Sequence, residues 1–91
     1  MRFEWDEKKR LINIRKHAID FADDPAIFES DIVTVIDDRF EYSETRYQTL
    51  GLLKSRVIMV VHTESETVIR IISARKANKH EEEIYFREIS D

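Results

Sequence analysis

Cations gather between Arg70 and His80, where a hydrophobic strand-like run passes into a helix-like one. The basic or potentially basic side chains in this segment are those of Arg70, Arg75, Lys76, Lys79 and His80. Such a cluster favours an anion site, and nucleic acid is the commonest large anion available to a small protein. A basic run between a strand and a helix is also often only a solvated edge. Charge alone leaves both interpretations open.

The composition limits what this segment can belong to. At 91 residues the chain predicts a single domain, residues 1–91, near the lower size for one hydrophobic core. The formal net charge of -4 argues against nucleic-acid binding by diffuse charge, so any such contact is expected to be local. Without Cys, and with three His residues lacking close ligand spacing, we expect no metal site and no cofactor. No signal-like or membrane-spanning segment is seen, which predicts a cytoplasmic protein without membrane contact.

Two helices are predicted before the strands. The first has Asp6 as its N-cap and runs to about His17. Its apolar stripe is expected to comprise Leu11, Ile12 and Ile14. Asp20 resembles a second N-cap, and the short helix that follows contains Pro25, which can bend it or delay its start.

Four strands and a terminal helix complete the expected order. The strand-like runs are Ile32 to Ile36, Arg46 to Leu53, Val57 to Thr63 and Val68 to Ala74. Tight turns fit between the last three, so we expect an antiparallel meander. Asn78 with Glu81 three residues later predicts a capping box for the final helix. The fold class is therefore α+β, with a four-stranded, mainly antiparallel sheet covered by helices on one face.

Three segments together resemble one known family. They are FEWDEKKRLINIRKHAIDF (Phe3 to Phe21), the Glu44-x-Arg46 pair, and RIISARKANKHEEEIY (Arg70 to Tyr85). The combination resembles the BrnT toxins of type II toxin-antitoxin pairs over nearly the whole length. The resemblance implies a RelE-like fold and a ribonuclease that arrests translation by cutting RNA. It also implies a BrnA-like antitoxin with a ribbon-helix-helix module, through which the pair would bind operator DNA.

The chain departs from the family pattern at two positions. Ala18 stands where the family usually has Gly, and Gly suits the left-handed residue that ends a helix. Ala tolerates that conformation less well, at a cost of roughly 1 kcal/mol, so the first helix could end differently. Asn78 stands where Thr is common, and both residues cap helices.

Metal-free RNA cleavage needs a base for the 2′-hydroxyl, cations for the phosphorane and an acid for the leaving oxygen. We assign Arg70 and Arg75 to the phosphate, with Lys76 assisting as a point charge. Arg46 is a second-rank partner from a neighbouring strand. The candidates for the remaining roles are Glu44 or Glu81 as base and Tyr85 as a residue that stacks on a nucleotide base or orients the phosphate.

Each of these residues also has a structural interpretation. Arg70 interrupts an apolar strand and could instead pair with a carboxylate such as Glu44 or Glu64. Glu81 could be only a helix cap, and Tyr85 could be only a core residue. The alternative function is a non-catalytic binding module, which would use the basic junction and a sheet edge to bind a protein partner.

Overall fold

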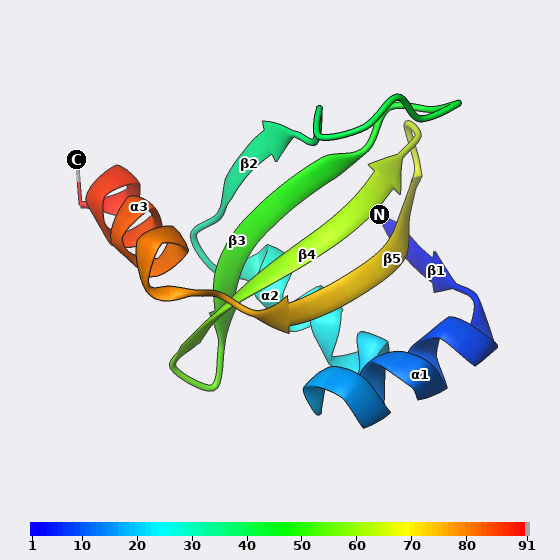
Figure 1. Cartoon of the computed structure of the whole chain (residues 1–91), viewed down its shortest axis with the longest axis horizontal. Coiled ribbons are helices and arrows are strands. Elements are labelled where there is room, and N and C mark those ends of the chain that lie inside the picture. Colours follow the sequence, from blue (N-terminus) through cyan, green and yellow to red (C-terminus); the bar gives the residue numbers. More distant parts are fainter. Residues whose placement is uncertain (91) are drawn as a thin grey trace.

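The computed structural model describes residues 1–90. Within them, helices pack around a five-stranded sheet whose strand order is β1-β5-β4-β3-β2 (Figure 1). The strands are β1 (Arg2–Trp5), β2 (Val33–Ile36), β3 (Tyr47–Leu53), β4 (Arg56–Glu64) and β5 (Val68–Lys76). The helices are α1 (Glu7–His17), the 3-10 helix η1 (Phe21–Asp23), α2 (Asp24–Glu29) and α3 (Lys79–Ile89). The predicted α+β class is confirmed.

The sheet contains one strand more than predicted. The strands β2, β3, β4 and β5 pair antiparallel in chain order, which confirms the meander. β1 then adds in parallel to the outer side of β5, so that Glu4 lies opposite Arg70. The prediction of four strands is wrong because β1 is only four residues long and directly precedes a helix. Its one signal is the alternation of Phe3 and Trp5 around Glu4.

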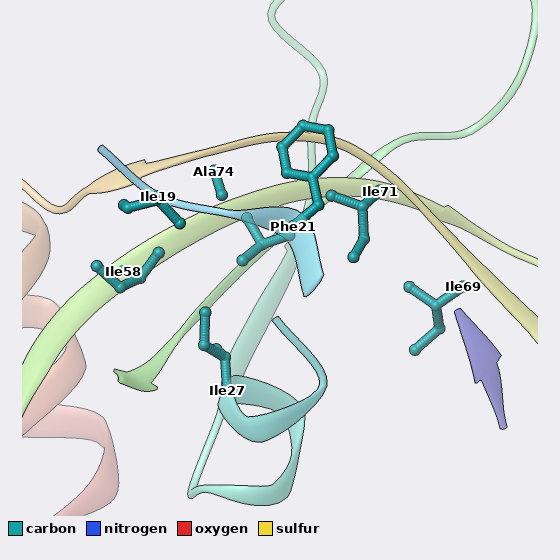
Figure 2. Close-up of a cluster of buried hydrophobic side chains, with 8 residues drawn as sticks. Ile19, Phe21, Ile27, Ile58, Ile69, Ile71 and Ala74 are labelled. Atoms are coloured by element: carbon teal, nitrogen blue, oxygen red, sulfur yellow. The ribbon is translucent and has the colours of Figure 1, made fainter. Parts of the chain in front are cut away.

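Helices cover both faces of the sheet, which corrects the prediction of a single covered face. Successive residues of β4 point to opposite sides. Ile58 and Val60 join a cluster under η1 and α2, shown in Figure 2, whereas Val57, Met59 and Val61 join Tyr85 of α3. We call these two sides the α1 face and the α3 face. Phe3 and Trp5 of β1 pack against the first cluster.

Polar contacts rather than an apolar stripe hold α1 against the sheet. Leu11 and Ile12 are 52% and 51% exposed, so the predicted stripe is wrong for both residues. The buried residue is Asn13, whose amide donates to Ala74 O (2.8 Å) and whose Oδ1 accepts from Ala74 N (3.1 Å). Asn13 also donates to Ile19 O (2.9 Å). Its side chain thereby satisfies the backbone of β5 at a position beyond the end of β1.

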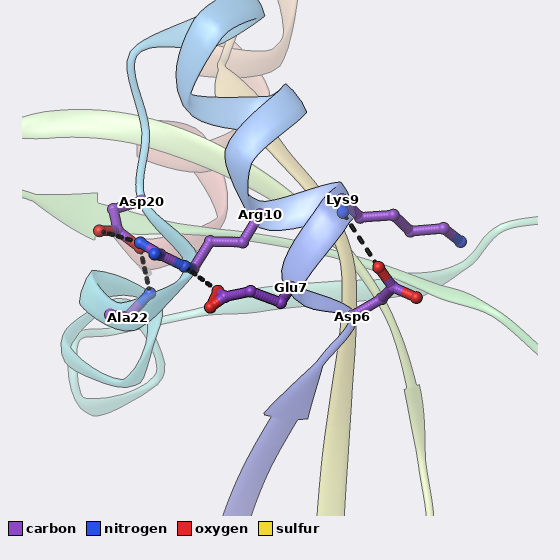
Figure 3. Close-up of polar contacts among 6 residues, drawn as sticks. All are labelled: Asp6, Glu7, Lys9, Arg10, Asp20 and Ala22. Atoms are coloured by element: carbon purple, nitrogen blue, oxygen red, sulfur yellow. Dashed lines mark hydrogen bonds and ion pairs between the residues drawn. The ribbon is translucent and has the colours of Figure 1, made fainter.

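The predicted N-caps lie where ion pairs join α1 to η1 (Figure 3). Asp6 accepts a backbone N–H at the start of α1 (3.1 Å), and Asp20 accepts one from Ala22 (2.9 Å). Arg10 donates to Glu7 within α1 and to Asp20 at the start of η1 (2.9 Å). Both caps are confirmed, and Arg10 joins the two elements.

The second predicted helix is divided by its proline. The helical turns begin as η1, and the α-helix α2 starts only at Asp24, with Pro25 in its first turn. Proline is tolerated there because the first N–H groups of a helix have no intrahelical acceptor. The delayed start is confirmed. Among residues 1–90, no helix combines the length and apolar character needed to cross a membrane.

Three non-glycine residues adopt positive φ at sharp turns. Lys54 (φ 51°) and Ser55 (φ 69°) form the two-residue connection between β3 and β4. Ala18 (φ 58°, ψ 30°) ends α1 in the left-handed conformation, and its N–H donates to Ile14 O (2.8 Å). The helix therefore ends as a glycine would end it. The strain at Ala18 is of the order of 1 kcal/mol.

Candidate functional site

Arg70 and Arg75 lie on the same face of β5 although five positions separate them. In a regular strand an odd separation places side chains on opposite faces. The ladder between β4 and β5 skips Ile72, which forms a β-bulge and reverses the alternation. Arg70 consequently lies opposite Thr63 and Arg75 opposite Met59, both on the α3 face.

Arg75 forms a bidentate ion pair with Glu81 at the start of α3. Its Nη1 and Nη2 donate to Oε1 and Oε2 of Glu81, each at 2.8 Å. Glu81 in turn accepts from the N–H of Asn78 (2.9 Å), whose Oδ1 accepts from the N–H of Glu81 (2.8 Å). The predicted capping box is thus present, and the same carboxylate that begins α3 also fixes the guanidinium.

One edge of the Arg75 guanidinium stays available. Arginine carries five N–H donors. Glu81 takes one hydrogen from each terminal nitrogen, and Lys76 O accepts a further bond from Nη1 (3.3 Å). Within residues 1–90, no hydrogen bond engages Nε, and the side chain is 33% exposed. The Nε–Nη2 edge can therefore donate to two oxygens of an anion while Glu81 remains bound.

The environment of Glu81 opposes its use as a base. The hydrogen bonds from Arg75 lower the pKa of Glu81 below its ordinary value, and the N–H of Asn78 acts in the same direction. A carboxylate stabilised in its ionised form is a weaker proton acceptor. The geometry favours Glu81 as the residue that positions Arg75.

Arg70 is paired more loosely and at a different place. Its Nη1 donates to Oε1 of Glu4 at 3.2 Å, and both side chains are close to half exposed. The partner is therefore Glu4 of the unpredicted strand β1, and not Glu44 or Glu64. All three carboxylates line a cleft of about 590 Å³ together with Arg70.

Arg70 and Arg75 do not converge on a single point. Because the bulge adds a residue to β5, their partners Thr63 and Met59 lie only four residues apart, and the two backbones are roughly 13 Å apart. Their guanidinium groups bind different carboxylates, those of Glu4 and Glu81. Two separate phosphates suit this arrangement better than one shared phosphate.

Arg46 shares the α3 face with both arginines. It lies two positions before Gln48, which lines a cavity under α3. Continuing the β3–β4 register places Arg46 opposite Thr63, the residue that also lies opposite Arg70, so the two arginine backbones are about 10 Å apart. The Arg46 guanidinium carbon stacks 4.2 Å from the centroid of Tyr42. Its Nε is buried and has no partner within residues 1–90.

Two other predicted site residues lie away from this arrangement. Lys76 pairs with Ile58, whose side chain belongs to the α1 face, so Lys76 and its neighbour Arg75 project to opposite faces. Tyr85 is completely buried in the α3 cluster, and its hydroxyl donates to Asp31 O (2.7 Å). In this conformation the Tyr85 ring has no exposed surface on which a nucleotide base could stack.

Buried ionisable groups occur on the other face of the sheet. Asp24 is fully buried, its oxygens have no partner within residues 1–90, and burial raises its pKa to about 8. His62 is also fully buried; its Nε2 lies 2.7 Å from Thr49 Oγ1, and burial lowers its pKa to about 4. Both groups are neutral near pH 7, Asp24 protonated and His62 unprotonated.

Several of these contacts have no local signal in the sequence. Glu4 and Tyr42 were not predicted as partners of the arginines. The alternation around Glu4 could have indicated a strand, but the position of Tyr42 depends on the loop from Asp37 to Arg46 and has no local signal. Within residues 1–90, no three His, Asp or Glu side chains converge as metal ligands would.

Comparison with known proteins identifies the family. The sequence model described as "Ribonuclease toxin, BrnT, of type II toxin-antitoxin system" matches residues 5–81. The chain belongs to the BrnT family. No curated protein matches the sequence significantly. Membership in the BrnT family implies an RNA substrate and an antitoxin partner, and the matched region includes Arg46, Arg70, Arg75 and Glu81.

Proposed function

We propose that this BrnT-family toxin is a metal-independent endoribonuclease in which Arg75 stabilises the scissile phosphate. The observation that carries the proposal is the Nε–Nη2 edge of Arg75, which has no partner among residues 1–90 while Glu81 holds the other end of the guanidinium. A planar fork fixed in this way matches two phosphate oxygens and needs little rearrangement during the reaction.

The chemistry is an internal transfer of the phosphodiester. The 2′-oxygen attacks phosphorus as a base removes its proton, and the bond from phosphorus to the 5′-oxygen breaks as that oxygen gains a proton. The products are a 2′,3′-cyclic phosphate and a 5′-hydroxyl. Arg75 offsets the negative charge that develops on the phosphorane oxygens. Glu44 remains a candidate base, and Glu81 acts by positioning Arg75.

The other cations extend the proposed RNA contact. Arg70 and Arg46 lie on the same face as Arg75, so the three arginines can contact separate phosphates of one RNA strand. Arg70 could exchange its exposed bond to Glu4 for a phosphate at small cost, since exposed ion pairs contribute little stability. Lys76 adds charge from the opposite face of the strand.

The cellular role proposed here follows from the family. We propose that the protein acts in the cytoplasm, has a RelE-like fold and inhibits translation by cutting RNA. A BrnA-like ribbon-helix-helix antitoxin would neutralise it and bind operator DNA for the complex. The net charge of -4 disfavours tight DNA binding by the toxin alone.

The test is cleavage of RNA by the purified protein in excess EDTA, followed by analysis of the new ends. We expect cleavage to persist and the ends to be 2′,3′-cyclic phosphate and 5′-hydroxyl. Complete loss in EDTA with recovery in Mg²⁺ would contradict the metal-independent mechanism. An intact RNA under all conditions would favour a binding module instead.

A further inference from the structure

The strand β2 presents unused backbone groups at the outer edge of the sheet (Figure 1). Just beyond the strand, Asp37 N donates to Arg46 O of the neighbouring chain segment (2.8 Å). In an antiparallel ladder, inward-bonded residues alternate with outward-facing ones. Val33 and Val35 therefore bond inward to β3, whereas Thr34 and Ile36 each direct an N–H and a C=O away from the sheet.

This edge is apolar, unlike the edge at the other side of the sheet. Val35 and Ile36 are 55% and 63% exposed, and Phe40 follows at 67%. The opposite edge strand, β1, instead carries the charged side chains of Arg2 and Glu4. Charged side chains on an edge strand discourage further pairing, and β2 has none.

Acidic residues surround the β2 edge. The segment from Glu29 to Glu44 contains six Asp or Glu residues and one basic residue, Arg39. Arg39 is already paired with Asp37 (2.8 Å). A second copy of this chain at the same edge would bring like charges together, so the charge favours a partner segment that is basic and apolar.

An apolar cavity of about 140 Å³ connects this edge to the arginine site. Its lining includes Val33 and Val35 of β2 and, under α3, Ile84 and Glu81. Glu81 is the residue that holds Arg75. A side chain entering the cavity from a strand beside β2 would therefore contact the residue that positions the proposed catalytic arginine.

We propose that the antitoxin adds a strand to β2, through a segment with apolar side chains flanked by Lys or Arg. Backbone bonds to Thr34 and Ile36 supply the pairing, and an apolar side chain packs over Val35 into the cavity beside Glu81. The partner is known from family membership, whereas neutralisation by contact with Glu81 rests on the proposed function.

Amide hydrogen exchange of the toxin, alone and bound to its purified cognate antitoxin, tests the site. We expect the Thr34 and Ile36 amides to exchange rapidly in the free protein and to be protected at least about tenfold in the complex. The inward-facing Val35 amide is the internal control and should be protected in both. A complex that forms without protecting Thr34 and Ile36 would overturn the docking site but not the ribonuclease. Protection that rises with the concentration of toxin alone would indicate self-pairing and also overturn the proposal.

A proline at the edge provides a second test. Ile36→Pro removes an outward N–H that the β2–β3 ladder does not use, and proline is tolerated on edge strands. We expect Kd for the antitoxin to rise at least about tenfold while RNA cleavage is unchanged. The matched variant Ile36→Thr keeps the N–H and should weaken binding less. If Ile36→Pro and the unchanged protein both fold and bind the antitoxin with equal affinity, strand addition is refuted. If the unchanged protein does not cleave RNA, the proposed function is refuted instead.

Discussion

The two faces of the sheet place ionisable residues in opposite environments, one that favours the charged form and one that favours the neutral form. On the α3 face, Arg75 and Glu81 pair closely enough to lower the pKa of the carboxyl group, and both groups stay charged. On the α1 face, burial raises the pKa of Asp24 to about 8 and lowers that of His62 to about 4, so both are neutral near pH 7. The α3 face thus keeps the Arg75–Glu81 pair charged, whereas burial on the α1 face neutralises Asp24 and His62.

The neutral face and the charged face are therefore expected to respond differently to substitution. Changes on the α3 face should act mainly on RNA cleavage, whereas changes on the α1 face should act mainly on the free energy of unfolding. An α3-face variant that alters only stability, or an α1-face variant that alters only cleavage, would contradict this expectation.

The largest effect is expected for Arg75→Ala. Losing a group that stabilises the phosphorane should slow single-turnover RNA cleavage by at least about a hundredfold. The substitution also leaves the half-buried Glu81 without its partner, so we expect a loss of about 1–3 kcal/mol in the free energy of unfolding.

In that experiment, a loss of cleavage caused by unfolding must be distinguished from one caused by the missing guanidinium. Arg87→Ala removes an exposed cation from α3, the helix that carries Glu81, and should leave cleavage within about twofold. The assay is therefore run well below the melting temperature of each variant. A folded Arg75→Ala protein with native cleavage would exclude Arg75 from the site.

Substitutions of Glu81 should have smaller effects, of about tenfold. Glu81→Ala removes the positioning contact and one part of the capping box. Glu81→Gln keeps an oxygen acceptor for Arg75 and should recover most of the cleavage, with the same pH–rate profile as the unchanged protein. Loss of the acidic limb from the profile of Glu81→Gln, where the rate rises as the base loses its proton, would instead show that Glu81 is the general base.

Asp24→Asn should change stability and leave cleavage intact. The folded state keeps the Asp24 proton up to about pH 8, whereas the unfolded state releases it near its ordinary pKa of 3.8. Folding is thus linked to proton uptake, and stability falls as pH rises through this window. Below about pH 6.5, His62 acts in the opposite direction, because its unfolded form binds a proton that its folded form excludes.

Between about pH 6.5 and 8, the effect of Asp24 on stability is separated from that of His62. There we expect the unchanged protein to lose about 1 kcal/mol of unfolding free energy per pH unit, by denaturant titration, and Asp24→Asn to lose much less. Asp38→Asn, in an exposed loop, is the control and should keep the slope. A flat profile for the unchanged protein would refute a protonated Asp24.

The smallest effect is expected where α1 ends. Ala18→Gly relieves the positive φ and should raise the free energy of unfolding by about 0.5–1 kcal/mol, with cleavage unchanged. Ala26 is an exposed residue within α2, and Ala26→Gly should lower the free energy of unfolding. A melting temperature lowered by Ala18→Gly would contradict the strain assigned to Ala18.

Local signals predicted much of this fold. The caps Asp6, Asp20 and Asn78 and the delayed start at Pro25 depend on residues close in sequence, and all are confirmed. The pairing of β1 with β5 joins residues more than sixty positions apart, and no local pattern specifies it. The hydrogen bonds of Asn13 to the backbone of Ala74 likewise depend on tertiary structure, because the two residues are far apart in sequence.

The candidate site shows the same limit. Arg75 and Glu81 could both be selected from the sequence, since one lies in the basic cluster and the other in the capping box. Their mutual ion pair could not, because it depends on the turn between β5 and α3. The shared face of Arg70 and Arg75 depends on a bulge at Ile72, and an apolar residue in an apolar strand gives no warning of a bulge.

The most direct test of the two-face account is an NMR titration of the toxin with a short 2′-deoxy analogue of RNA, which binds but lacks the attacking hydroxyl. The account predicts shifts at the Nε–H of Arg75 and Arg70 and at the backbone of the α3 face, with the Asn13 and His62 signals unchanged. Shifts confined to α1 and its basic residues, with the Arg75 Nε–H signal unchanged, would contradict it.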